Sequence, residues 1–147
     1  MYTPLNRGNI AKFNCKSESY DWVNREFDEQ YVSYNTNYLY LYQHFGRGIN
    51  QISKATGKTT NQIIFKDAFN ERYHSSGRIW SSDKFVISKD LESGKFCVID
   101  ANSLKPIALE FVMRRGFSNS EATFQINGST IYAVSYTHLT LPTTPYV

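Results

Sequence analysis

The sequence of 147 residues has few of the residue types that build common structural and catalytic sites. It contains only two cysteines, Cys15 and Cys97, and two cysteines far apart in sequence do not define a disulfide framework. We therefore expect reduced thiols, with Cys97 a small core residue in the apolar run 96–99. Metal sites are normally seeded by close pairs of Cys or His, which this chain lacks. No metal or other cofactor is therefore expected.

Long apolar segments and a strong charge excess are also missing. No apolar run approaches the length of about 18 residues that suggests a membrane helix, and no charged and then apolar leader follows Met1. These absences predict a cytoplasmic protein that does not enter a membrane. The 16 basic and 13 acidic residues give a net charge of +3, which permits an anionic partner without requiring one.

The end of the chain resembles the translated DNA of a sequencing adapter. Residues 134–143, Val-Ser-Tyr-Thr-His-Leu-Thr-Leu-Pro-Thr, match one reading frame of a transposon-based library adapter. Ala133 fits the codon before that frame, and a Val followed by a stop codon fits Val147. We therefore expect residues 1–132 to be a single truncated domain and residues 133–147 to be an artefactual, loosely packed tail. A genuine Thr- and Pro-rich terminal peptide is the alternative.

The first half of the chain is predicted to be helical. Apolar residues recur at spacings of four and three over 23–34, which favours an amphipathic helix over about 20–33 with Ser19 as its cap. Two shorter helices are expected over 48–57 and 59–65.

The segment Tyr38-Leu39-Tyr40-Leu41-Tyr42 alternates strictly. This pattern favours a strand with the tyrosines on one face, and a helix continuing into residues 43–45 is the competing interpretation.

After Arg72 the pattern becomes that of β-structure. Asn127-Gly128 is the strongest two-residue hairpin signal, and a strand over 107–113 competes with a helix over 108–115. Short apolar or alternating runs separated by turn residues predict strands over 78–80, 84–88, 95–100, 107–113, 123–126 and 130–132.

The predicted fold class is therefore α+β. An N-terminal helical part, from Ser19 to about Arg72, is followed by an antiparallel sheet of short strands from Arg78 to Tyr132, truncated at the C-terminus. No internal repeat is evident in the sequence.

Residues 52–63 resemble a helix-turn-helix unit. Ile52 and Ile63 supply an apolar residue on each helix, and Gly57 permits the positive φ of the turn. The resemblance implies contacts with duplex DNA from the second helix, and the pair ending the 109–113 run adds a candidate phosphate contact. The candidate nucleic-acid-binding residues are Lys58, Thr59, Thr60, Asn61, Gln62, Arg114 and Arg115.

Three function classes remain. The helix-turn-helix resemblance favours a small nucleic-acid-binding or regulatory protein. The alternative is a non-enzymatic protein-interaction or structural module, in which the tyrosines anchor an interface with a protein partner. An enzyme is less favoured, because no motif identifies catalytic residues.

Overall fold

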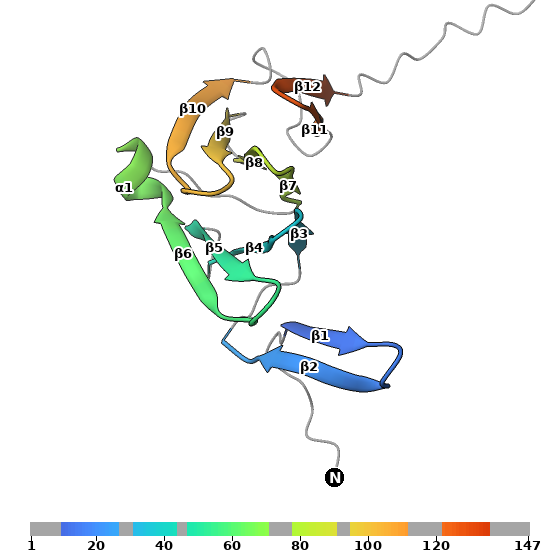
Figure 1. Cartoon of the computed structure of the whole chain (residues 1–147). Coiled ribbons are helices and arrows are strands. Elements are labelled where there is room, and N and C mark those ends of the chain that lie inside the picture. Colours follow the sequence, from blue (N-terminus) through green and yellow to red (C-terminus); the bar gives the residue numbers. More distant parts are fainter. Residues whose placement is uncertain are drawn as a thin grey trace, which may run out of the picture.

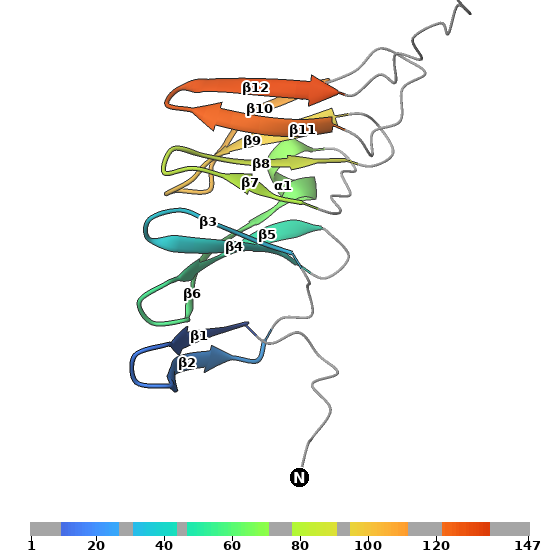
Figure 2. The same ribbon diagram turned by 90° about the vertical axis from the view of Figure 1, so that its right-hand side faces the viewer.

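The computed structural model describes residues 10–26, 31–43, 47–70, 78–90, 95–111 and 122–135. These residues form twelve β-strands and one short helix, and the strands pair into two four-stranded sheets and two hairpins. Figure 1 shows the helix beside the stacked sheets, and Figure 2 shows the four β layers one above another in chain order.

Both four-stranded sheets are antiparallel meanders, because each strand pairs with the next one in the chain. The first sheet contains β3 (Val32–Tyr34), β4 (Tyr38–Tyr42), β5 (Gly48–Ser53) and β6 (Thr59–Ile64), and it is followed by helix α1 (Phe65–Phe69). The second sheet contains β7 (Trp80–Ser81), β8 (Phe85–Lys89), β9 (Lys95–Asp100) and β10 (Pro106–Phe111).

A hairpin lies at each end of this stack. One is formed by β1 (Ile10–Asn14) and β2 (Ser19–Asn24), and the other by β11 (Ala122–Asn127) and β12 (Thr130–Ser135). Residues Ala133–Ser135 of the predicted adapter-encoded tail therefore belong to β12, and residues 136–147 lie outside the described part.

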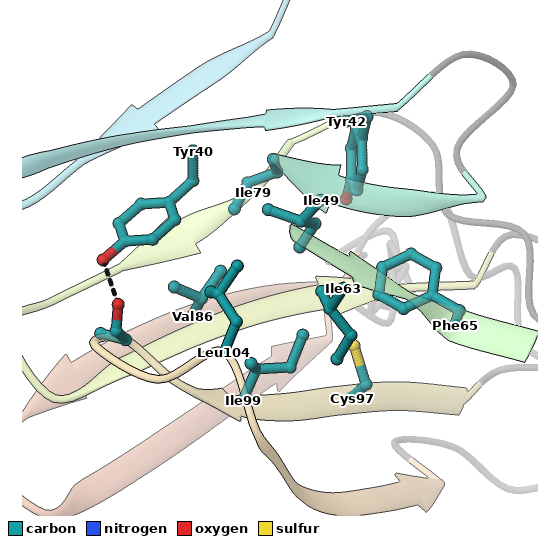
Figure 3. Packing of buried hydrophobic residues seen from close by; sticks show 11 residues of the cluster. Tyr40, Tyr42, Ile49, Ile63, Phe65, Ile79, Val86, Cys97, Ile99 and Leu104 are labelled. Atoms are coloured by element: carbon teal, nitrogen blue, oxygen red, sulfur yellow. Dashed lines mark hydrogen bonds between the residues drawn. The ribbon is translucent and has the colours of Figure 1, made fainter. Parts of the chain in front are cut away.

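The main hydrophobic core lies between the two four-stranded sheets (Figure 3). Its fully buried members include Tyr40, Ile49, Phe65, Val86 and Ile99. A second cluster joins Leu41 and Ile52 to the first hairpin, and a third joins Trp80, Ile87 and Phe124 of the second sheet and last hairpin. Each layer thus buries apolar side chains against the next, which is the main stabilising term in such a stack.

The alternation of Tyr38-Leu39-Tyr40-Leu41-Tyr42 is confirmed as a strand. Tyr40 and Tyr42 belong to the core between the sheets, whereas Leu39 and Leu41 contact the other face, toward the first hairpin. The prediction that Cys97 is a core residue is also confirmed, because it is fully buried. The Asn127-Gly128 signal correctly predicted the hairpin of β11 and β12, and Gly128 has a φ of 58°.

One turn is built the same way three times along the chain, and each copy precedes the last strand of its sheet or hairpin. The side chains of Asn14, Ser53 and Asp100 accept hydrogen bonds from the backbone N–H groups two and three residues later. The residue four positions later is left-handed in every case: Glu18 at φ 50°, Gly57 at φ 70° and Leu104 at φ 53°.

A second turn repeats between the first two strands of each four-stranded sheet. The Asn35 and Ser82 side chains each accept a hydrogen bond from the backbone N–H three residues later, at Tyr38 and Phe85. Asn35 and Ser82 are separated by the same number of residues as Ser53 and Asp100. The two sheets are therefore structural repeats of one unit. The first of these turns assigns β1 and β2 to its third and fourth strands. Strand β11 contacts β7 as β7 contacts β3, which assigns β11 and β12 to its first and second strands.

The sheets fan out from their first strands. Strands β3, β7 and β11 contact each other in turn along one side of the stack, whereas α1 contacts both β6 and β10 on the opposite side (Figure 1). Four-stranded meanders of about 40 to 50 residues that radiate in this way are the blades of a β-propeller. The described chain has two such blades and a half-blade at each end.

The predicted α+β fold is wrong, because the predicted helical part consists of strands. Residues 19–24 form β2, and Val23 and Tyr34, on which the helical spacing depended, are exposed by 43% and 67%. The β-branched and aromatic residues of this segment favour a strand, and these side chains do not form a buried face. The helix predicted over 48–57 is instead β5 and its turn, and the alternative helix over 108–115 is β10 as far as Phe111.

Candidate interaction surface on the first strands

The first strands of three neighbouring layers form one continuous surface, which we call the first-strand surface: β3, β7 and β11. Hydroxyl groups hold β3 and β7 together. Ser81 Oγ donates its single proton to the carbonyl oxygen of Tyr34, at 2.8 Å. Ser33 Oγ is therefore the donor in the 2.5 Å hydrogen bond between Ser33 Oγ and Ser81 Oγ. This arrangement fixes the spacing of two strands that belong to different sheets.

The turn between β3 and β4 is also fixed to the second sheet. Asp83 accepts hydrogen bonds from the backbone N–H and the hydroxyl of Thr36, at 2.9 and 2.8 Å, and these bonds hold the pKa of the Asp83 carboxyl below its usual value. Asn35 Nδ2 donates both to the Tyr40 hydroxyl and to the carbonyl oxygen of Ser82. Both turns are therefore held rigidly at one end of the surface.

A pocket of about 390 Å³ opens on the first-strand surface. Its buried aromatic side chains are Trp80 and Phe124, whose rings meet edge to face with centroids 4.8 Å apart. Phe96 packs against Phe124 with a centroid distance of 5.1 Å. The pocket is lined by Val32, Ser33, Tyr34, Arg78, Ile79, Trp80, Ser81, Phe124 and Ile126.

Cationic side chains stand over the aromatic rings of this surface. The Arg78 guanidinium lies 5.8 Å from the centre of the Trp80 ring, and Lys89 Nζ lies 5.9 Å from the same ring. Lys54 Nζ lies 5.3 Å from the Tyr34 ring and donates a 3.0 Å hydrogen bond to the Asn35 carbonyl oxygen. Burial lowers the pKa of Lys89 from its usual value. Such cation–π contacts hold long side chains over the rings.

The rim of the pocket is unusually exposed for its residue types. Tyr34 is 67% exposed and Val32 is 50% exposed, and the two flank Ser33 on β3. Exposed Tyr and Arg around a buried Trp are the residue types that dominate the energetic centres of protein interfaces.

The helix-turn-helix resemblance is wrong, because residues 52–63 belong to two paired strands. Ile52 is in β5 and Ile63 is in β6, and the turn between these strands is the second copy of the repeated turn, with Gly57 as its left-handed residue. The predicted positive φ of Gly57 is confirmed, but it reverses a β-hairpin. No recognition helix exists in this segment, so the structure gives no support to DNA binding.

The residues predicted to open a recognition helix lie instead on a turn and on strand β6. Lys58 is exposed at the turn, and Thr59–Gln62 lie along β6, where neighbouring side chains point to opposite faces. Thr60 donates to Gln51 Oε1 at 2.8 Å and Asn61 to the Ser103 carbonyl oxygen at 2.9 Å. These two side chains thus connect elements inside the protein. Arg114 and Arg115 lie outside the described residues.

The described segments contain no candidate metal cluster and no candidate membrane-spanning helix. There, no group of three or more His, Cys, Asp or Glu side chains could hold a metal ion. Within the same segments, no helix is long and apolar enough to cross a bilayer. His44 and His74 lie outside them.

The sequence interpretation missed the surface altogether. Tyr34, Arg78 and Phe124 come from three different layers, so no local pattern connects them. The repeated turns were the sequence signal that could have revealed this surface. Aligning Ser53 with Asp100 also aligns β3 with β7, so the two strands hold the same place in neighbouring sheets.

Comparison with known proteins supports the architecture. No known family model matches the sequence, and no curated protein matches it. The fold is similar to that in the crystal structure of BamB from Moraxella catarrhalis, with a TM-score of 0.61 and 15% sequence identity. The similarity covers 89% of this chain and 42% of the BamB chain, so this chain spans less than half the length of that protein.

Proposed function

We propose that this chain is a non-enzymatic protein-interaction module that binds a segment of a partner protein on the first-strand surface. The observation that carries this proposal is the pocket between three layers, where exposed Tyr34 and Arg78 surround the buried ring of Trp80. The partner would insert an apolar side chain over Trp80 and Phe124, with its main chain near the hydroxyls of the rim.

The physical chemistry of the surface supports this role. Tyr and Trp present large rigid contact areas at a low cost in conformational entropy, and Arg adds directional donors at the rim. The hydroxyl contacts between β3 and β7 hold the surface in place before binding, so little ordering free energy would oppose association. The similarity to BamB supports only the fold that builds this surface, because one fold can host many functions.

Selection of a displayed library of random peptides on the immobilised chain tests the proposal. We expect enriched peptides to contain an apolar anchor, and their affinity to fall about tenfold or more, at least ~1.4 kcal/mol, in Tyr34→Ser and in Arg78→Glu. Both side chains lie at the exposed rim, so the two variants should keep the fold.

Lys58→Glu is the matched control, because it makes the same reversal of charge at an exposed position on the turn between β5 and β6. Peptides that bind the wild type and Lys58→Glu equally but not Arg78→Glu would support the assignment. Enriched peptides that bind all variants equally would locate the interaction elsewhere and contradict it.

A further inference from the structure

Among the described residues that line the pocket on the first-strand surface, Arg78 alone carries a charge. Its side chain is exposed, and its guanidinium lies 5.8 Å from the centre of the Trp80 ring. In the part of the chain that the structure describes, no carboxylate lies within ion-pair distance of Arg78. The pocket therefore presents a positive charge that no described carboxylate neutralises.

The carboxylate at one end of this surface, Asp83, is already engaged. Its two oxygens accept hydrogen bonds from the backbone N–H and the hydroxyl of Thr36, at 2.9 and 2.8 Å. These hydrogen bonds, and to a smaller extent the charge of Lys54, hold the pKa of Asp83 below its usual value. The negative charge of Asp83 is thus balanced at the turn between β3 and β4, away from Arg78.

The two serine hydroxyls beside the pocket are acceptors for any further partner. Ser81 gives its proton to the carbonyl oxygen of Tyr34, and Ser33 gives its proton to Ser81. Ser33 Oγ keeps its lone pairs, and a backbone N–H group of a bound chain is a donor that fits them. The serine side of the pocket thus favours a donor, whereas Arg78 favours an anionic acceptor.

The floor of the pocket between these polar groups is apolar. Trp80 and Phe124 are 7% and 4% exposed, so an apolar side chain that reaches them is removed from water. The volume of about 390 Å³ lies near the lower end of the range for ligand pockets, which suits side chains of an extended peptide. A peptide supplies the N–H donor, the apolar group and the anion together where Asp or Glu lies close to an apolar residue.

A single-stranded nucleic acid also combines negative charge with apolar rings, but it fits this surface less well. Its binding uses exposed aromatic faces for base stacking and a basic groove that follows the phosphates. Here the rings of Trp80 and Phe124 are buried, and Arg78 is the one charged group in the described lining. The observations therefore favour a peptide.

We propose that the partner segment on the first-strand surface is an acidic peptide, in which an Asp or Glu close to the apolar anchor pairs with Arg78. This inference rests on the proposed function, because it names the chemistry of the segment that the pocket would bind.

Three displayed peptide libraries test the proposal. Each has a random apolar residue at its centre, and the positions around it are restricted to Asp and Glu, to Asn and Gln, or to Lys and Arg. On the immobilised wild-type chain we expect the acidic library to be enriched about fivefold or more over the amide library. This excess should shrink as the salt concentration rises, because salt screens the ion pair.

Reversing the charge of the protein should reverse the selection. We expect Arg78→Glu to favour the basic library, and Arg78→Gln to show no preference for charge. Arg78→Lys should keep a preference for the acidic library, because it retains the positive charge. Lys58→Glu is the matched control, since it reverses a charge at an exposed position on another turn, and it should select as the wild type does.

The outcomes separate this inference from the proposed function. Equal enrichment of the acidic and amide libraries, with binding that Tyr34→Ser still weakens, would overturn the acidic partner and leave the peptide-binding role intact. Enrichment of no library would overturn both. An acidic preference that persists in Arg78→Glu would place the recognising cation elsewhere and contradict the assignment. A labelled oligothymidylate that displaces the enriched peptides would show that the pocket recognises a nucleic acid instead.

Discussion

Replacing Gly57 by alanine is the sharpest test of how the layers are joined. Gly57 has a φ of 70°, and a Cβ atom there would lie 2.5 Å from Cδ2 and Cε3 of the Trp22 ring. That ring cannot simply withdraw, because Trp22 Nε1 donates a 3.1 Å hydrogen bond to the Lys54 carbonyl oxygen. Asn24 Nδ2 also donates to the Gly57 carbonyl oxygen at 2.7 Å, which holds the turn against β2.

Two costs add in this variant. A left-handed alanine costs about 1 to 2 kcal/mol. Overpacking against a fixed ring costs about 1 to 3 kcal/mol more. We therefore expect Gly57→Ala to lower the free energy of unfolding by about 2 to 5 kcal/mol, measured by urea denaturation.

Gly128 offers a matched control in the same protein. Its φ is 58°, but no atom lies within 4 Å of an added Cβ, so Gly128→Ala should cost only the backbone term of about 1 to 2 kcal/mol. In a Trp22→Ala background the Gly57→Ala cost should fall to that same value, because the clash is removed. Equal costs for Gly57→Ala and Gly128→Ala in the wild type would refute the docking of this turn on Trp22.

Three further predictions follow from single side chains. Burial raises the pKa of Tyr40 to about 12, so the stability contributed by its protonated phenol is complete below pH ~10 and is lost as the pH rises toward 12. Urea denaturation should therefore show that Tyr40→Phe loses less stability than the wild type over that window, and parallel pH profiles would contradict the assignment. Hydrogen bonds from the Ser103 amide and hydroxyl hold the pKa of Asp100 below its usual value, which gives stability above pH ~4 that is lost on acidification. Asp100→Ala should then cost about 1 kcal/mol at neutral pH and less in acid, by the same assay, whereas a cost independent of pH would argue against it. Finally, a thiol reagent should label exposed Cys15 in the native chain and buried Cys97 only after unfolding, and rapid labelling of both would be inconsistent with the core described above.

The parts of the fold that could be predicted from the sequence are those with one strong local signal. The strict alternation from Tyr38 to Tyr42 and the Asn127-Gly128 hairpin each specify a local geometry that the rest of the chain does not override. Strands β8 and β9 were found for the same reason, as apolar runs separated by turn residues.

Strand β5 was missed because both of its faces are covered. In β5, Ile49, Gln51 and Ile52 are all buried, so no polar face produces a period of two. The resulting pattern of apolar positions suits a helix equally well. The β-branched residues Thr59 and Thr60 in β6 carried the opposing signal.

The first-strand surface could not be predicted, because its residues are brought together by the stacking of whole sheets. The structural repeat that positions these residues could not be seen in the sequence. Its equivalent positions share a physical role but not a residue type. Ser53 and Asp100 are both acceptors for backbone N–H groups, and Gly57 and Leu104 share only a positive φ.

The predicted foreign origin of the tail is compatible with the strand that spans its start. β12 pairs with β11 from Thr130 to Ser135, so Val134 and Ser135 of the adapter-like run lie opposite Thr123 and Ala122. Strand pairing uses main-chain groups, and Ala-Val-Ser is an acceptable strand sequence whatever its source. Amplifying the genomic locus across the codon for Tyr132, without any library adapter, should give a different reading after Ala133. Recovery of Ser-Tyr-Thr-His from that locus would show that the tail is native.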